Sequence, residues 1–265
     1  MSHTLRYTVN CSLLFTELPL NERPRAARDA GFDAVEFWWP FESPTPPQDE
    51  IDAFVASLDN AGVRLTGLNF FAGALPGPDR GVLSHPGRAE EFRANVDVVT
   101  RIAERTGTTG FNALYGLRLP GADPAEQDRI ALENTLAAAE AVARVGGTVL
   151  VEPISGSDDY PLRTAAEGLG FVAWAREAGA ANVALLADLY HLVVNRDDLF
   201  AVVRDHAAEF GHVQIADSPG RGEPGTGRLP FDDLLRALQD AGYDGPVGLE
   251  YKPTVPSAKS FDWLG

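Results

Sequence analysis

Short apolar segments alternate with helical patterns from one end of the chain to the other. The segments are continuous apolar runs, as in 183–188, rather than alternations of apolar and polar residues. Such runs are typical of parallel strands that are buried on both faces. We expect strands at 6–10, 34–38, 63–69, 109–114, 148–152, 183–188, 211–215 and 247–250.

The helical patterns between these strands carry their own start signals. Asp123 precedes Pro124 and an acidic residue at the third helical position, and Thr164 with Glu167 matches a capping box. Eight such units and about 250 residues fit one barrel. We therefore predict an α/β fold, a single-domain (β/α)8 TIM barrel over residues 1–265 with a short C-terminal extension at 253–265. A doubly wound sheet is the alternative.

Charge and composition exclude several classes of partner. The net charge of −16 argues against nucleic acids and anionic membranes, because phosphate binding requires basic patches. No run approaches the roughly 20 apolar residues of a membrane span, and the N-terminus lacks a secretory signal. Cys11 is the single cysteine, so no internal disulfide can form. We expect a soluble cytoplasmic protein without nucleic-acid or membrane partners.

Four consecutive strands in the second half of the chain end in residues that can bind a cation. They are Glu152, Asp188, Gln214 and Glu250. The C-terminal ends of barrel strands meet at one face, where active sites lie. Three converging carboxylates would repel one another unless a cation lay between them. Oxygen ligands suit Mg²⁺ or Mn²⁺ better than Zn²⁺. The alternative is that acidic residues simply mark the change from strand to loop.

Two histidines lie close to these predicted ligands. His191 follows the sixth strand by three residues. We interpret it as a substrate contact or proton carrier, or else as a capping or loop histidine. His212 shares one strand face with Gln214, because alternate strand residues point the same way. It either lines the barrel near the substrate or supports a ligand.

The Gly/Pro-rich segment 219–227 formally contains a G-x-G-x-x-G pattern. Pro224 prevents the helix that this pattern must open in a dinucleotide-binding fold. We interpret the segment instead as a flexible lid over the substrate, carrying Arg221 and Glu223. Arg221 would bind a substrate carboxylate through paired hydrogen bonds, or else be a solvated arginine.

Stretches around the predicted ligands resemble the hydroxypyruvate isomerase family, which belongs to the xylose-isomerase-like TIM barrels. The resemblance covers nearly the whole chain and is most specific from His212 to Arg221. Gly222 departs from the pattern, because many relatives carry a histidine there, and this bears on the lid and the substrate preference. The matching stretches are 150–153, 188–191, 212–217, 219–227 and 248–251.

The resemblance implies roles for particular residues. Glu152 and Glu250 match the paired catalytic glutamates of the family, which also belong to its metal shell. The residues that match the rest of the metal shell and the substrate contacts are Asp188, Gln214, His191 and Arg221. The family also implies self-association into a homo-oligomer.

The implied reaction interconverts hydroxypyruvate and tartronate semialdehyde (2-hydroxy-3-oxopropanoate). A proton moves between adjacent carbons of this small hydroxy-carbonyl acid through an enediolate, which a divalent metal can stabilise. A 2-oxo-tetronate isomerase and a ketose 3-epimerase are the alternatives on the same barrel. A multi-zinc phosphodiester hydrolase needs more histidines near the ligands than this chain, with five in all, offers. A non-catalytic sugar-binding barrel would leave the converging ligands unexplained.

Overall fold

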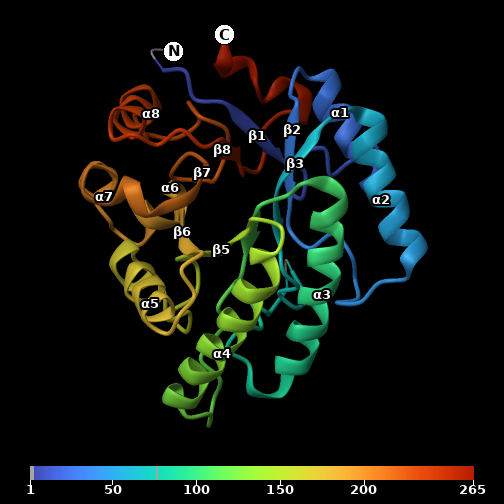
Figure 1. The fold of residues 1–265 in the computed structure, drawn as a ribbon. Coiled ribbons are helices and arrows are strands. Elements are labelled where there is room, and N and C mark those ends of the chain that lie inside the picture. Colours follow the sequence, from blue (N-terminus) through green and yellow to red (C-terminus); the bar gives the residue numbers. More distant parts are fainter. Residues whose placement is uncertain (1–2, 76) are drawn as a thin grey trace.

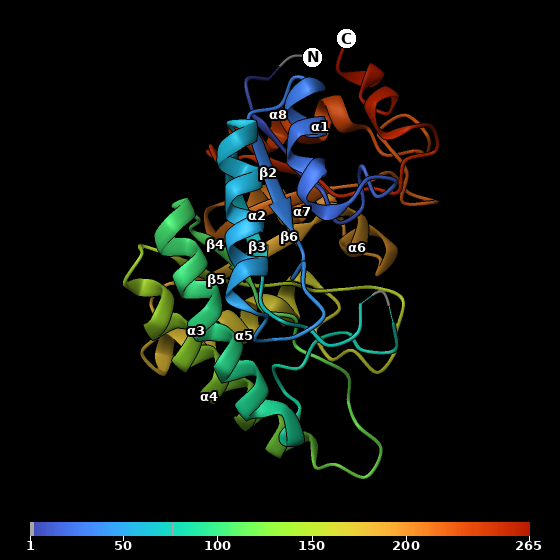
Figure 2. The ribbon, with the colours of Figure 1, turned by 90° about the vertical axis from the view of Figure 1, so that its right-hand side faces the viewer.

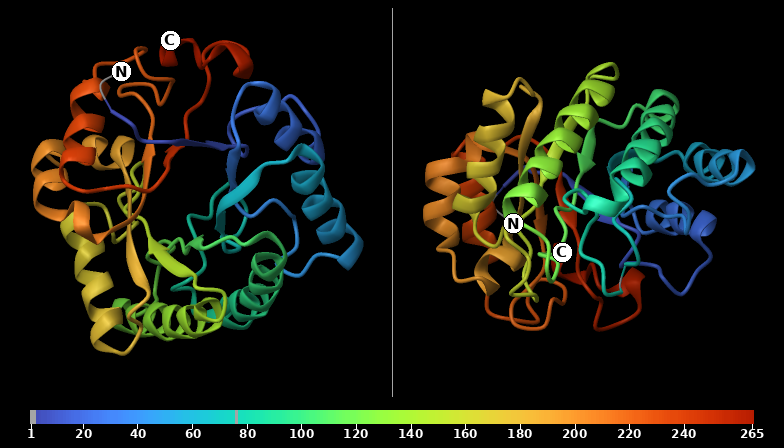
Figure 3. Two further views of the ribbon diagram at one scale, coloured as in Figure 1. Left: turned by 45° about the horizontal axis from the view of Figure 1, so that its top comes forward. Right: turned by 90° about the horizontal axis from the view of Figure 1, so that it is seen from below.

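Eight parallel strands form a closed barrel in the computed structural model, which describes residues 3–75 and 77–265. Each strand pairs with its neighbours in chain order, and the last strand closes the ring against the first. The helices surround the strands on the outside (Figure 1; Figure 3). This architecture confirms the predicted (β/α)8 barrel, although residues 1, 2 and 76 of the predicted domain lie outside the described residues.

The strands follow the predicted segments to within two residues at every end. They are three to six residues long. Their bounds are β1 (Tyr7–Asn10), β2 (Ala34–Phe37), β3 (Arg64–Asn69), β4 (Gly110–Asn112), β5 (Thr148–Val151), β6 (Val183–Asp188), β7 (Phe210–Ile215) and β8 (Val247–Leu249).

Two helices of the outer layer begin where the sequence signals predict. The Asp123 side chain accepts a hydrogen bond from Ala125 N–H, and Thr164 and Glu167 form a complete capping box. Within the described residues, no helix combines the length and the apolar character that crossing a membrane requires. The α-helices are α1 (Arg23–Asp29), α2 (Gln48–Ala61), α3 (Ala89–Thr106), α4 (Pro124–Ala143), α5 (Ala165–Glu177), α6 (Leu189–Val194), α7 (Leu199–His206) and α8 (Phe231–Asp240).

The segment after β8 replaces the helix that would complete the eighth unit. It forms two 3₁₀ turns at 257–259 and 262–264. Phe261 packs on Phe32 with 4.6 Å between ring centroids, and Trp263 packs on Tyr7 at 5.6 Å. The C-terminal segment therefore lies beside the start of β1, and both ends of the described chain lie on the same side of the molecule (Figure 2).

Apolar side chains fill the space between strands and helices, but the barrel interior is more polar. Leu150, Ala184 and Leu186 form a small apolar cluster of their own, separate from the main core. Buried polar residues such as Glu36 and Gln214 border the same interior space. Burying polar groups costs free energy unless they form hydrogen bonds. The hydrogen bonds inside the barrel are therefore described together with the site.

Candidate active site

The C-terminal ends of β5 to β8 bring the predicted metal ligands to one end of the barrel. Asp188 ends β6, and Glu152 and Glu250 directly follow β5 and β8. Gln214 pairs with Asp188 in the register of β6 and β7. All four side chains are buried, so their charges are removed from water at the end where barrel enzymes carry their sites.

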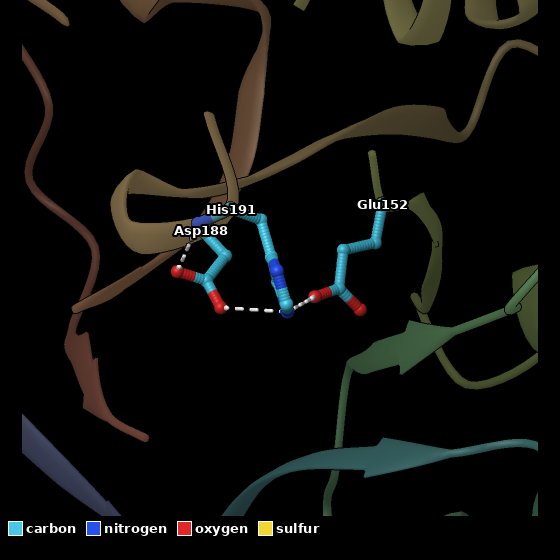
Figure 4. Close-up of side chains that lie close together, drawn as sticks. All are labelled: Glu152, Asp188 and His191. Atoms are coloured by element: carbon cyan, nitrogen blue, oxygen red, sulfur yellow. Dashed lines mark hydrogen bonds and ion pairs between the residues drawn. The ribbon is translucent and has the colours of Figure 1, made fainter. Parts of the chain in front are cut away.

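Among the described residues, Glu152, Asp188 and His191 form the one group of acidic and histidine side chains that could hold a metal ion. One ligand atom of each lies within 4.8 Å of the others. Figure 4 shows the His191 ring between the two carboxylates. Its Nε2 is 3.5 Å from Asp188 Oδ2 and 3.9 Å from Glu152 Oε1. Two buried acids this close favour a proton or a cation between them.

The surroundings of His191 decide which ring nitrogen carries the proton. Its Nδ1 lies 3.1 Å from the backbone N–H of Ser155 and 2.7 Å from the Ser155 hydroxyl. A backbone N–H can only donate, so Nδ1 accepts and the proton of the neutral ring is on Nε2. Burial, aided by the charge of Arg221, lowers the pKa of His191 well below its usual value. The neutral ring therefore presents a hydrogen-bond donor to the acids.

Several buried oxygen atoms at the site lack partners. Asp188 Oδ1 caps α6 by accepting hydrogen bonds from Tyr190 N–H at 2.8 Å and His191 N–H at 3.4 Å. Within the described residues, however, Asp188 Oδ2, Gln214 Oε1 and Asn112 Oδ1 have no hydrogen-bond partner. Buried acceptors are nearly always satisfied in proteins, so these atoms fit a site for a divalent cation or a polar substrate.

Arg221 brings a positive charge to the acids. Its Nη2 lies 2.6 Å from Glu250 Oε1 and 3.6 Å from Asp188 Oδ2. The Arg221 backbone has a φ of 60°, a left-handed conformation that residues with a Cβ seldom adopt. Backbone hydrogen bonds to Asp217 and from Lys252 hold it there. Arg221 Nε is buried and has no partner among the described residues, so one donor remains for a ligand.

Two asparagines that the sequence reasoning missed each hold one of the glutamates. Nδ2 of Asn112, at the end of β4, donates to Glu152 Oε2 at 2.6 Å. Nδ2 of Asn10, at the end of β1, donates to Glu250 Oε2 at 2.8 Å. One oxygen of each carboxylate is thus fixed and the other faces the remaining site residues. The available signal was position, because each asparagine is the last residue of its strand.

Glu36 is a third residue that the sequence reasoning missed. It lies in β2 and is buried inside the barrel. Its Oε2 is 2.7 Å from His212 Nε2, and its Oε1 accepts a hydrogen bond from Gln214 Nε2 at 2.7 Å. His212, predicted to lie near the substrate, therefore has its partner inside the barrel. The signal was a glutamate within an apolar strand, which burial permits only with partners.

Burial changes the protonation of the acids. It raises the pKa of Glu152 to about 8, and the negative charge of Asp188 adds to this shift. Burial also raises the pKa of Asp188 to about 6, although Arg221 opposes the shift. The pKa of Glu250 is raised well above its usual value by burial, again against the effect of Arg221. A nearby cation would favour the ionised acids.

The loop after β7 is tied together, which differs from the flexible lid that the sequence suggested. The Asp217 carboxylate accepts hydrogen bonds from Gly225 N–H and Gly227 N–H, both at 2.8 Å. Glu223, predicted as a substrate contact, accepts hydrogen bonds from the Thr254 backbone N–H at 2.9 Å and hydroxyl at 2.6 Å. These contacts join the loop to the segment after β8 and hold Arg221 between them.

Known proteins resemble this chain in sequence and in fold. The family described as xylose isomerase-like TIM barrel matches residues 24–265. A Streptomyces coelicolor protein, provisionally named hydroxypyruvate isomerase, is 57% identical over 98% of this chain and 95% of that protein. A 2-oxo-tetronate isomerase from Cupriavidus necator is 33% identical over 98% of this chain and 97% of that protein.

A solved structure shares the same barrel. The crystal structure, described as an AP endonuclease of family 2 from Brucella melitensis, superimposes with a TM-score of 0.88. Its sequence is 32% identical, and the match covers 98% of both chains. Together with the closed parallel barrel, these similarities settle the family. The chain belongs to the xylose isomerase-like TIM barrel family, within its hydroxypyruvate isomerase group, and is an isomerase.

Proposed function

We propose that the protein interconverts hydroxypyruvate and tartronate semialdehyde. The observation that carries the proposal is that Glu152 and Glu250 are held in the same way at one end of the barrel. Each is buried and has one oxygen held by an asparagine. The other oxygen faces His191 in one case and Arg221 in the other. Two acids held in this way can exchange protons with adjacent carbons of one small substrate.

The reaction moves one proton between carbons and another between oxygens. One glutamate removes a proton from C3 of hydroxypyruvate, and the electrons of that C–H bond form the C2–C3 double bond of the enediolate. A glutamate then returns a proton to C2, while the hydroxyl proton passes from O3 to O2 and leaves an aldehyde at C3. The Nε2–H of His191 can donate a hydrogen bond to a substrate oxygen during this exchange.

Arg221 favours an acid over a neutral sugar as the substrate. Its Nε is buried without a partner among the described residues, while its Nη2 contacts Glu250. A guanidinium with a free buried donor suits a carboxylate oxygen. A neutral ketose would leave that donor without an anionic acceptor. His212 and Glu223 are assigned supporting roles, because Glu36 and Thr254 already engage them.

The proposed metal shell consists of oxygen atoms from Glu152, Asp188, Gln214 and Glu250, and Mg²⁺ or Mn²⁺ suits this donor set. Support comes from the unpartnered Asp188 Oδ2 and Gln214 Oε1. His191 stays outside the shell, because its Nε2 carries a proton. A bound divalent ion would stabilise the negative charge that develops on the substrate oxygens.

The test is an assay of the purified protein with hydroxypyruvate, in which tartronate semialdehyde is measured before and after EDTA treatment. We expect turnover with a kcat of order 1 s⁻¹ or more, loss of turnover on chelation, and recovery with Mg²⁺ or Mn²⁺. A Glu152→Gln preparation controls for contaminating isomerases. Absence of turnover both with and without added metal would contradict the proposal.

A 2-oxo-tetronate is the second candidate substrate, because it also carries a carboxylate beside a ketone and a relative bears that name. Arg221 would engage either acid in the same way. Comparison of kcat/KM for hydroxypyruvate, a 2-oxo-tetronate and a free ketose decides between them. A preference for the ketose would remove the role given to Arg221.

A further inference from the structure

Glu36 makes contacts that the proposed reaction does not use. It lies on β2, whereas the acids lie at the ends of β5, β6 and β8, and its carboxylate reaches Asn10 in β1 and Gln214 in β7. Its Oε1 accepts hydrogen bonds from Asn10 Nδ2 at 3.1 Å and from Gln214 Nε2 at 2.7 Å. Its Oε2 faces His212 Nε2 at 2.7 Å. An amide N–H can only donate, so Asn10 and Gln214 both donate to Glu36.

These contacts determine how the Gln214 amide is turned. Because its Nε2 donates to Glu36, its Oε1 points away, and that oxygen is buried with no partner among the described residues. The Asn10 amide is fixed from both ends. Its Oδ1 accepts a hydrogen bond from Ser12 N–H at 3.0 Å, and its Nδ2 donates to both Glu36 and Glu250.

The barrel interior leaves room for Glu36 at two glycines. A Cβ built at Gly248 would lie 2.7 Å from Glu36 Oε1 and 2.8 Å from Gln214 Cγ. A Cβ at Gly67 would lie 3.3 Å from the Cβ of Glu36. Larger residues at these positions would displace the carboxylate or the amide. The carboxylate and the amide therefore occupy space that the glycines in β3 and β8 leave open.

We infer that Glu36 is a positioning residue that turns the Gln214 amide oxygen, and through Asn10 the Glu250 carboxylate, toward a divalent metal ion. The inference rests on the metal shell of the proposed function. Residues that orient metal ligands from outside the coordination sphere typically contribute 10- to 100-fold in metal affinity. Without an acceptor at position 36, the Gln214 amide could turn and present its NH₂ group to the metal.

The experiment titrates Mn²⁺ into metal-free protein and follows the EPR signal of free Mn²⁺. We expect Glu36→Met to weaken Mn²⁺ binding by about 10- to 100-fold. Glu36→Gln keeps one acceptor oxygen for Gln214, and His212 Nε2 can accept from the new amide when its proton is on Nδ1. We therefore expect Glu36→Gln to retain Mn²⁺ affinity within about fivefold of the wild type, because the Gln214 amide keeps its acceptor.

A second substitution separates orientation from folding. Glu36→Met combined with Gln214→Glu places a carboxylate with two equivalent oxygens at position 214, so its orientation no longer matters. We expect this double variant to recover wild-type Mn²⁺ affinity. Gln127→Met is the matched control, because Gln127 is buried on the outer helix α4 and hydrogen-bonded to Leu117 and Leu119 in the loop after β4. It should lower the melting temperature without changing Mn²⁺ affinity.

Three results with the variants would overturn the inference. They are wild-type affinity in Glu36→Met, equal loss in Glu36→Gln and Glu36→Met, and a double variant no tighter than Glu36→Met. Failure of the wild-type protein to bind Mn²⁺ would also overturn it. The hydroxypyruvate assay tests the proposed reaction separately. Turnover without Mn²⁺ binding would contradict the metal shell and this inference but would still support the isomerase reaction.

Discussion

The side chains at the C-terminal ends of strands β1 to β4 differ in their roles from those at the ends of strands β5 to β8. In the first half, Asn10, Glu36 and Asn112 each engage another buried side chain. In the second half, Glu152 and Asp188 have pKa values raised by burial, and one Asp188 oxygen accepts no hydrogen bond from the described residues. We infer from this difference that the first half holds the acids in place, while the second half supplies the reacting groups.

The contacts between the halves follow the ring of strands. Asn112 and Glu152 join β4 to β5, and Asn10 and Glu250 join β1 to β8. These are the two places where the halves meet around the barrel. Glu36 instead reaches β7 through the interior. The acids are therefore held from neighbouring strands and from inside the barrel, which limits the positions they can adopt.

The strongest test of this division removes the reacting acids. Glu152→Gln and Glu250→Gln should each lower kcat for hydroxypyruvate by about 10²- to 10⁴-fold, because proton transfer by a side chain contributes that much. Steady-state kinetics would measure the change, with circular dichroism to check folding. If either variant keeps near wild-type turnover, that glutamate does not transfer the proton.

Loss of Arg221 should have the next largest effect. Arg221→Ala should raise KM for hydroxypyruvate by about 10- to 100-fold, because a charged hydrogen bond contributes about 1.5–3 kcal/mol. KM for a neutral ketose should change little. Arg228→Ala is the matched control, since Arg228 is exposed in the same loop. An equal increase in KM for the acid and for the ketose would show that Arg221 does not bind the substrate carboxylate.

A smaller effect should follow from removing the hydrogen bond between Asn112 and Glu152. Asn112→Ala should lower kcat roughly tenfold, since a hydrogen bond to a charged group contributes about 1.5 kcal/mol or more. The Asn112 bond also lowers the pKa of Glu152, so its loss should move the ascending limb of the pH–rate profile to higher pH. Asn69→Ala, at the end of β3, is the control. Unchanged profiles in both variants would argue that Asn112 does not hold Glu152.

The smallest expected effect concerns stability and pH. Burial raises the pKa of Glu152 from an ordinary 4.5 to about 8, so the folded state binds the proton more tightly than the unfolded state. Stability from this group is therefore complete below pH 4.5 and is lost as the pH rises toward 8. The metal-free protein should melt at a lower temperature at pH 8 than at pH 5.5. The difference should be about 2–4 °C for each kcal/mol lost from the free energy of unfolding.

Glu152→Gln provides the control for this pH effect, because it removes the titrating group. Calorimetry of metal-free protein at constant ionic strength should give a flatter dependence on pH for the variant. Added Mn²⁺ should raise the melting temperature most at high pH, since the acids bind metal when ionised. A melting temperature that depends on pH equally in both proteins would exclude Glu152 as the source.

Much of the fold could be predicted from the sequence, because strands and helix starts have local signals. The four metal-shell candidates were visible because each ends an apolar run. Helix α6 was missed, since Asp188 both ends β6 and caps the helix, which leaves no loop between them. The sequence predicted a short extension after β8 but not that its turns take the place of the eighth helix. Their packing on Tyr7 and Phe32 depends on residues far away in the chain.

The supporting residues of the site could not be predicted in the same way. Glu36 and Gln214 are separated by 178 positions in the chain, and their contact depends on the diameter of the barrel and on the space left at Gly248. Asn10 and Asn112 stand at strand ends, where an asparagine is unremarkable on its own. Only the closed ring shows that each one lies next to a glutamate.

The packing of the last segment on the first strand also sets when this protein can fold during its synthesis. β8 and the turns at 257–264 both cover β1, and they are synthesised long after it, since Val247 follows Asn10 by 237 positions (247 − 10). At about 5–20 residues per second, the first strand waits roughly ten seconds or more without its final neighbours. Until then β1 can pair with β2 but lacks its second neighbour in the sheet, so the ring of strands cannot close.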